Sequence, residues 1–504
     1  MTTEVELKFL VSNTNVSAKI FELLKTQSLA FTHQHKKLTN CYFDTPELAL
    51  RQLDMGLRTR IDEGEIEQTI KTAGVVVGGL HQRPEYNVNI TQAFPDLTLF
   101  PHDIWPVDEN ISQLQAQLIP LFNTDFSREI WQINYQNSRI ELAFDQGTVS
   151  SDGRNLDICE LELELLSGER DDLFALAKLL FTQLALRAGT KSKAARGYQL
   201  FANKDKPVTP ISLDIECAAQ QTSRYFISGV DFCLQALQQV VANYIATKKL
   251  VKLAELVDIL SLLRHGFWLF NESLTLECQK LRSEISHFIQ LFAWVDNALY
   301  LRELMNKTGN YRKKLEYSEQ LIEQLKIEKQ HFPDSLMVMQ LLQSERFNKL
   351  QLELLQLIVN GSENENLIKQ QANSELLPFA QVKLSDSLRE LQQQMTQLTQ
   401  LDAQSYLAKR QVLHRCLLTG HWFGQLFDEQ LRADFRTPWL DMKQGLKELQ
   451  SLWIIKQQLE KLAKNSEQTN NKVLRWQQGK VENLLTALAH SKELALSLPA
   501  YWLS

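Results

Sequence analysis

The sequence predicts two differently built parts: a strand-rich α+β domain over residues 1–203 and an all-α domain over residues 219–504, joined by a linker over residues 204–218. Stretches that alternate with period two occur in the first part, which is typical of strands. The second part instead has apolar residues at helical spacing, as in Leu237, Val240, Val241 and Tyr244. Two prolines among small polar residues mark the linker between them.

Helices interrupt the strands of the first part. We expect them near residues 16–28, 109–122 and 169–186, with Ala188-Gly189 ending the last one. Turn signals such as Gly78-Gly79 and Asp152-Gly153 separate the strands. In the second part, a break over residues 360–378 divides the helical pattern, which predicts two helical bundles.

Composition and charge exclude several classes of protein. Of the 504 residues, 44% are hydrophobic and 23% are charged, which is typical of a globular protein. The net charge of −6 argues against nucleic acid or a membrane surface as partner. No apolar stretch is long enough to cross a bilayer, and the start has no secretory pattern. Six cysteines without a C-x-x-C pair favour reduced thiols and a cytoplasmic protein.

Charged residues recur on single strand faces of the first part, because alternate residues of a strand point to the same side. The sets that share a face are Glu4, Glu6 and Lys8; Arg58 and Arg60; Arg83 and Glu85; Glu141 and Asp145; Glu160, Glu162 and Glu164; Lys191 and Lys193. Any one of these strands is most simply a sheet face in water. Runs of one sign weaken that interpretation, since like charges repel unless counter-charges or metals lie close.

A sheet closed on itself, with its charged faces inward, would bring acidic and basic side chains around one lumen. Arginine and lysine suit phosphate oxygens, whereas carboxylates beside a polyanion are harmful unless they hold a divalent cation. Mg²⁺ binds through one or two carboxylates together with phosphate oxygens. We therefore expect a triphosphate and a metal to share this lumen.

The segment Glu4-Val5-Glu6-Leu7-Lys8 resembles the E-x-E-x-K signature of the CYTH superfamily, the triphosphate tunnel metalloenzymes. Further matches follow in family order over residues 1–202. They are Tyr42-Phe43-Asp44-Thr45-Pro46, Leu57-Arg58-Thr59-Arg60, Lys71, Arg83-Pro84-Glu85-Tyr86, Arg128, Asp145-Gln146-Gly147, Glu160 to Leu165, and Lys191-Ser192-Lys193 with Arg196-Gly197-Tyr198.

The resemblance implies an eight-stranded antiparallel tunnel with flanking helices. It also implies hydrolysis of inorganic triphosphate to phosphate and diphosphate by a water activated by Mg²⁺ or Mn²⁺. Residue by residue, it implies catalytic roles for Glu4, Glu6 and Lys8. It implies metal ligation by Glu4 and Glu6 together with two of three further glutamates, Glu160, Glu162 and Glu164. The register of that strand, and so the choice of two, stays open. The implied phosphate contacts are Lys8, Arg58, Arg60, Lys71, Arg83, Arg128, Lys191 and Lys193. Further lumen carboxylates are Glu85, Glu141 and Asp145. No histidine is required, so we interpret His33, His35 and His81 as loop or surface residues.

A tunnel followed by a helical half is similar to the bacterial CYTH–CHAD inorganic triphosphatases, whose CHAD domain is associated with polyphosphate. Few of the basic residues expected there remain: Arg264, His265, Lys409, Arg410, His414 and Arg415. Polyphosphate or a protein is the partner expected for this half. Three alternatives stay open: hydrolysis of thiamine triphosphate or a nucleoside triphosphate, ATP cyclisation, and binding of polyphosphate without turnover.

Overall fold

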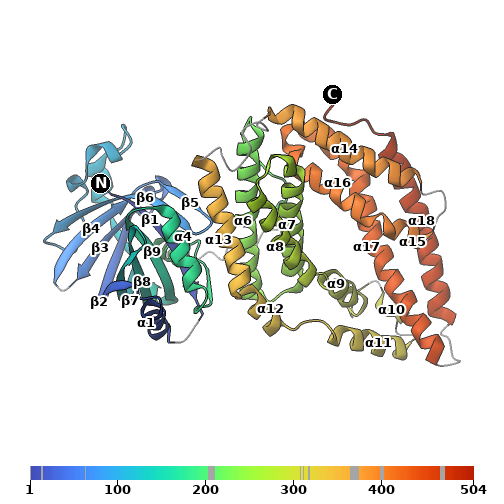
Figure 1. Ribbon diagram of the computed structural model, residues 1–504, viewed down its shortest axis with the longest axis horizontal. Coiled ribbons are helices and arrows are strands. Elements are labelled where there is room, and N and C mark those ends of the chain that lie inside the picture. Colours follow the sequence, from blue (N-terminus) through green and yellow to red (C-terminus); the bar gives the residue numbers. More distant parts are fainter. Residues whose placement is uncertain are drawn as a thin grey trace. The chain divides into compact units, whose positions relative to one another are not determined.

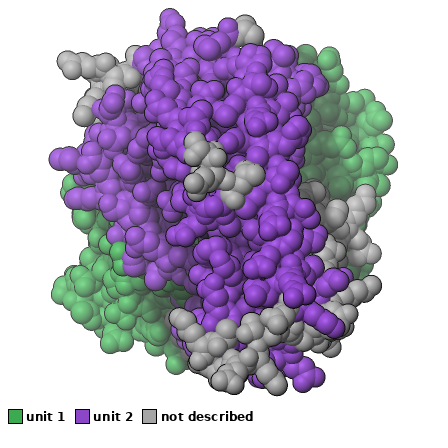
Figure 2. Space-filling view, turned by 90° about the vertical axis from the view of Figure 1, so that its right-hand side faces the viewer, with its two compact units in different colours: residues 1–209, 341–356 green, residues 210–340, 357–504 purple. Residues whose placement is uncertain are grey.

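The computed structural model describes residues 2–12, 15–62, 64–202, 211–306, 308–309, 311–315, 318–363, 374–397, 402–465 and 471–503. The chain divides into two compact units, which Figures 1 and 2 show: Met1–Thr209 with Leu341–Gln356, and Pro210–Gln340 with Leu357–Ser504. The first part of the predicted linker, residues 204–210, lies outside the described residues. So does most of the predicted break, residues 364–373.

Antiparallel strands build the first unit. They are β1 (Thr2–Val11), β2 (Ala30–Asp44), β3 (Gly56–Asp62), β4 (Glu65–Lys71), β5 (Val75–Val77), β6 (Leu80–Ile90), β7 (Ile119–Tyr135), β8 (Ser138–Ser151), β9 (Arg154–Ser167) and β10 (Leu186–Ala188). Their order is β10-β1-β9-β8-β7-β2-β3-β4-β6-β5, and β1 also pairs with β6. Eight of the described strands, β1 to β9 without β5, therefore close into a ring, and β5 and β10 extend it. The predicted α+β tunnel is confirmed.

In strands whose residues alternate between apolar and charged, the apolar residues lie on the outward face of the ring. Leu161, Leu163 and Leu142 are fully buried there. The helices of this unit are α1 (Val16–Thr26), α2 (Ala49–Gln52), α3 (Ile111–Ala116), α4 (Arg170–Leu180) and α5 (Lys193–Phe201). From α1, the Phe21 ring lies 5.5 Å from the ring of the buried Trp131 on β7. The apolar face of β7 is thus covered by a helix, and its opposite face is left for the lumen.

Two predicted helices are shorter than expected. The helix predicted over residues 109–122 ends at Ala116, because strand β7 begins at Ile119 and Pro120 cannot continue a helix. The helix predicted to reach residue 186 ends at Leu180, and Leu186 already pairs with Val11 of β1. The helix predicted over residues 16–28 is confirmed as α1, which ends at Thr26.

The predicted strand face of Lys191 and Lys193 is wrong. The Ser192 side chain accepts a hydrogen bond from the Ala195 backbone N–H at 3.1 Å, and so caps helix α5, which begins at Lys193. Gly197 lets this helix lie against the sheet, because a Cβ there would come within 2.1 Å of the Phe122 ring. Lys193 is therefore brought to the sheet by a helix, while Lys191 stays exposed.

The second unit is all-α, as predicted. Its helices, together with α13, which contributes residues to both units, are α6 (Thr222–Thr247), α7 (Leu250–Leu269), α8 (Leu276–Leu291), α9 (Val295–Leu304), α10 (Arg312–Leu315), α11 (Glu319–Gln330), α12 (Ser335–Leu342), α13 (Glu345–Glu363), α14 (Leu376–Thr396), α15 (Ala403–Ala408), α16 (Arg410–Phe423), α17 (Glu429–Asn465) and α18 (Asn471–Ser497). Trp422 anchors the core, since its Nε1 donates to the Leu262 carbonyl at 2.9 Å and a Cβ on Gly229 or Gly266 would strike its ring. Among the described residues, no helix is both long and apolar enough to span a bilayer.

Candidate functional site

A row of three carboxylates crosses adjacent strands of the tunnel. Glu164 of β9 lies directly opposite Glu6 of β1 on one side and Glu141 of β8 on the other. Glu4 points to the same face of β1, two residues before Glu6. Like charges at directly opposed positions destabilise a sheet unless a cation lies between them. The pairing places Glu164 directly opposite Glu6, and Glu162 opposite Lys8. Which two of Glu160, Glu162 and Glu164 bind a metal stays a prediction.

The row carries more negative charge than its surroundings neutralise. Burial, followed by the charges of Glu4, Glu141 and Glu6, raises the pKa of Glu164 to about 8. Burial also raises the pKa of Glu4, although the Lys71 ammonium acts in the opposite direction. A carboxyl group whose pKa is raised by burial and neighbouring negative charge is stabilised in its ionised form by a nearby cation.

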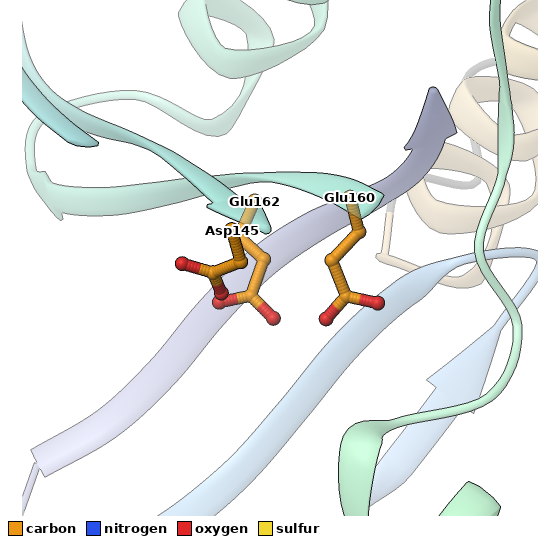
Figure 3. A group of neighbouring side chains, drawn as sticks. All are labelled: Asp145, Glu160 and Glu162. Carbon is orange, nitrogen blue, oxygen red and sulfur yellow. The ribbon is translucent and has the colours of Figure 1, made fainter. Parts of the chain in front are cut away.

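A second group of carboxylates, Asp145, Glu160 and Glu162, lies close together on β8 and β9 (Figure 3). Their oxygens are near enough to one another to share a metal ion. The Lys193 ammonium already contacts all three carboxylates, at 2.6, 2.5 and 2.9 Å.

Arginines and a further lysine complete the neutralisation of this group. Arg128 donates to Asp145 at 2.7 and 2.6 Å and to Glu162 at 2.5 Å. Arg196 pairs with Glu160, and Lys8 pairs with Glu162. The protein's own cations thus occupy this group, whereas the described residues place no cation within 4 Å of Glu164 or Glu141, and Lys8 lies 3.2 Å from Glu6.

Basic side chains face the lumen from the other strands. Lys71 of β4 contacts Glu4, and it also contacts Glu85 at 3.0 Å. Arg58 of β3 lies 3.6 Å from Glu85. Arg60 differs from both, because its guanidinium has no ion pair among the described residues and donates a hydrogen bond to the Asn40 side-chain oxygen at 2.8 Å. Burial and the charges of Arg58 and Arg128 lower its pKa to about 10. Arg60 therefore presents a guanidinium without a carboxylate, which is suited to an anionic ligand.

The predicted residues converge on one cavity of about 520 Å³ inside the tunnel. Those that line it are Glu4, Glu6, Lys8, Arg58, Arg60, Lys71, Arg83, Glu85, Arg128, Glu141, Glu162, Glu164 and Lys193. Asp145 and Glu160 lie behind the lining and are fully buried. Lys191 does not join them, since its ammonium donates to Gln199 at 2.9 Å on the surface.

His81 was interpreted as a loop or surface residue, and that interpretation is wrong. It lies on β6, it is only 6% exposed, and it lines the cavity. One ring nitrogen is 3.4 Å from the Gly189 carbonyl. Burial and the Lys8 charge lower the pKa of His81 to about 4, so the ring is neutral at physiological pH. Its alternation with Arg83 and Glu85 on the same strand was the signal that could have placed it in the lumen.

Tyr42, Asn87, Thr69 and Ser192 also line the cavity, and the sequence interpretation assigned them no role there. Thr69, Asn87 and Ser192 each share a strand or a turn with a predicted residue, whereas Tyr42 lies on β2, which carries none of them. Asn87, for example, follows Glu85 with the same phase on β6 and accepts a hydrogen bond from Thr69 at 2.8 Å. These neutral groups add hydrogen-bonding capacity between the charged walls.

The first unit is thus a closed antiparallel tunnel. Carboxylates in its lumen can bind a cation, and guanidinium groups in the same lumen can bind a polyanion. Residues 2–198 match the family model of the CYTH domain, and this part of the chain is a CYTH domain. The predicted membership of the first part is confirmed.

One curated relative is the inorganic triphosphatase of Haemophilus influenzae, which is 36% identical over 200 residues. The alignment covers 40% of this chain and 55% of that protein, so the chain spans about half the length of this relative. Among solved structures, a Hippeastrum protein described as an adenylyl cyclase with a dominant triphosphatase activity aligns at 17% identity and a TM-score of 0.31, over 40% of this chain and 98% of its own. The CHAD domain of the plant Ricinus communis aligns at 18% identity and a TM-score of 0.42, over 59% of this chain and 99% of its own.

Proposed function

We propose that the protein hydrolyses inorganic triphosphate to phosphate and diphosphate inside the tunnel, with Mg²⁺ or Mn²⁺ as cofactor. The observation that carries the proposal is the row of Glu6, Glu164 and Glu141 facing basic side chains across one cavity. The 36% identity to an inorganic triphosphatase over 200 residues supports it.

The donor set of the row fits a hard divalent cation. Carboxylate oxygens are the ligands that Mg²⁺ prefers, and it keeps positions for phosphate oxygens. The raised pKa of Glu164 supports this assignment, because a bound dication would offset the burial and the repulsion by neighbouring carboxylates that cause it. Glu4, Glu6 and Glu164 would hold the cation, with Glu141 beside them. When bound, the cation would supply Lewis-acid stabilisation of the charge that develops on the phosphoryl group.

The basic residues would hold and orient the triphosphate. Arg60 can take a phosphate oxygen without first breaking an ion pair. Arg58 and Lys71 would share their charge between Glu85 and the ligand. Lys8, Arg83, Arg128 and Lys193 would complete the cation lining, with Lys193 and Arg128 also keeping Asp145 and Glu162 ionised. Charge neutralisation from several directions is the main requirement of phosphoryl transfer. Lys191 lies on the surface, outside the cavity lining, so the proposal limits any contact of Lys191 with substrate to the outside of the tunnel.

The test is phosphate release by the purified full chain, with and without Mg²⁺ or Mn²⁺. We expect turnover of inorganic triphosphate that is abolished by a chelator and by Glu6→Gln, but retained by Glu65→Gln, a matched change at an exposed residue of β4. Turnover that persists in Glu6→Gln would refute the metal assignment.

Other triphosphates are the second candidates, because the lumen itself would serve any of them. The same assay with thiamine triphosphate, ATP and other nucleoside triphosphates separates these substrates. Cyclic AMP formation from ATP would identify a cyclase. Tight binding of polyphosphate without turnover of any triphosphate would identify a binder. A CHAD-type role for the helical unit, with polyphosphate or a protein as partner, and a cytoplasmic location stay predictions.

A further inference from the structure

The helical unit contains a cavity of about 1460 Å³ that is separate from the tunnel. Helices α7, α8, α9, α16 and α17 contribute most of its lining, and they can be followed in Figure 1. Its wall combines both signs of charge with neutral polar groups such as Gln411, Gln444 and Asn306. A polar cavity of this size in one folded unit is large enough for a small organic ligand.

Two opposite charges face this cavity without a partner. Asp258 of α7 and Lys443 of α17 both line it, and the described residues give neither side chain a hydrogen bond or an ion pair within 4 Å. A carboxylate and an ammonium in one cavity normally meet, because each partly buried charge costs free energy when it is unpaired. Here they stay apart, so the space between them is available to a ligand.

The cationic side is reinforced from the same helix. Lys447 lies one helical turn after Lys443, also lines the cavity, and has no ion pair in the described chain. Like charges at this spacing repel each other, and an anion between them would relieve the repulsion. Arg410 of α16 adds a guanidinium, which lies 3.9 Å from Asp296 at the exposed rim. Arg264, Arg302 and Lys329 also line the cavity without an ion pair in the described chain, but Lys443 and Lys447 are the pair of cations that act on the Asp258 carboxylate.

The ionisation of the two residues agrees with this geometry. Burial raises the pKa of Asp258, although Lys443 and Lys447 act against the rise. Burial lowers the pKa of Lys443, although Asp258 acts against the fall. Each charge thus stabilises the other electrostatically, yet the charged form of each group remains less stable than it would be in water.

From this arrangement we propose that the cavity of the helical unit binds a small zwitterion, with its phosphate or carboxylate group on Lys443 and Lys447 and its ammonium group on Asp258. Such a ligand satisfies both unpaired charges at once. A linear polyphosphate is the competing ligand, because lysines and arginines line the cavity beside its four carboxylates; the Asp258 carboxylate, which would repel a polyanion and attract an ammonium group, distinguishes the two.

Calorimetric titration of the full chain with O-phosphoethanolamine tests the proposal. We expect binding that weakens at least tenfold in Lys443→Met and in Asp258→Asn. The affinity for inorganic phosphate should fall in Lys443→Met but not in Asp258→Asn. The affinity for ethanolamine should fall in Asp258→Asn but not in Lys443→Met. Lys456→Met serves as the matched control, since Lys456 is on α17 but pairs with Glu460 and does not line the cavity.

Two further measurements locate the binding and exclude a folding defect. Arg60→Ala should leave the titration unchanged, which separates this cavity from the tunnel. Far-ultraviolet circular dichroism and the thermal transition of Asp258→Asn and Lys443→Met should match those of the native chain, which shows that the helical unit of both variants folds. Three results would each overturn the proposal. The first is no binding at 10 mM O-phosphoethanolamine, and the second is equal affinity of the native chain and Asp258→Asn. The third is tighter binding of linear polyphosphate with an affinity that Asp258→Asn does not change.

Discussion

Glu6 and Glu164 face each other directly across β1 and β9, two acidic side chains at opposed positions of an antiparallel pair. In a metal-free sheet this costs roughly 0.2–1 kcal/mol. We therefore expect Glu164→Gln to raise the melting temperature of the first unit in chelator-treated protein while it lowers triphosphate turnover on the order of a hundredfold or more. Calorimetry and phosphate release measure the two effects. A variant that loses stability and activity together would show a structural role instead.

Divalent cations should stabilise the same unit. A ligand that binds only the folded state adds about 2.7 kcal/mol at a concentration one hundred times its Kd. We expect Mg²⁺ or Mn²⁺ to shift the thermal transition of the native chain upward and to leave that of Glu6→Gln nearly unmoved. The exposed Glu65→Gln variant should respond like the native chain. An equal shift in Glu6→Gln would place the cation elsewhere.

Arg60 should matter for substrate engagement more than its neighbours. Its guanidinium donates a hydrogen bond to a neutral group, the Asn40 side-chain oxygen, instead of a carboxylate. A charged hydrogen bond to phosphate contributes about 1.5–3 kcal/mol, so Arg60→Ala should raise KM or lower kcat/KM by about tenfold or more. Arg60→Lys should recover part of the loss, because it restores the charge but not the planar fork. Steady-state kinetics that match the native chain would remove Arg60 from the site.

Asp44 should be a structural residue of the first unit. Its fully buried carboxylate accepts hydrogen bonds from the backbone N–H groups of Thr45, Leu50 and Arg51 and from the Tyr198 hydroxyl at 2.9 Å. Asp44→Ala leaves these donors unsatisfied and should cost about 2–4 kcal/mol of unfolding free energy. Tyr198→Phe should cost about 1 kcal/mol. Denaturant titration followed in the tunnel unit gives both values. A near-neutral Asp44→Ala would contradict this assignment.

The alternation of charged residues was sufficient to predict the faces of the strands, because a strand has only two faces. It could not predict which glutamate of β9 lies opposite Glu6, since a shift of two residues keeps the same face. That choice depends on the pairing of β1 with β9, which joins distant parts of the chain.

A helix cap explains why the predicted strand face of Lys191 and Lys193 was wrong. Lys193 follows a period of two in the sequence, but the Ser192 cap starts a helix at that point. The apparent period was therefore accidental. The cavity around Asp258 and Lys443 could not be predicted, because it depends on the packing of helices far apart in the chain.

The helical unit should lose stability in mild acid because of His265. Burial, followed by the charges of His414, Arg415, Arg264 and Arg282, lowers the pKa of His265 to about 3, and its Nε2 lies 2.9 Å from the Thr419 hydroxyl. The unfolded chain has a histidine pKa near 6.5, so between about pH 6.5 and 3 it binds a proton that the folded state does not. Stability from this group is therefore fully present above pH 6.5 and falls as the pH drops, by at most about 1.4 kcal/mol per pH unit.

Hydrogen exchange in peptides of α7 and α16 measures this dependence between pH 7 and 4.5, after correction for intrinsic exchange rates. We expect protection to fall with pH in the native chain and to fall less steeply in His265→Asn, which can still hydrogen-bond Thr419 but does not titrate. His287→Asn on α8 is the matched control for replacing a histidine in this unit, because His287 is not among the charged groups named above that act on His265. Native and His265→Asn chains with the same slope would show that another group controls the acid sensitivity of these helices.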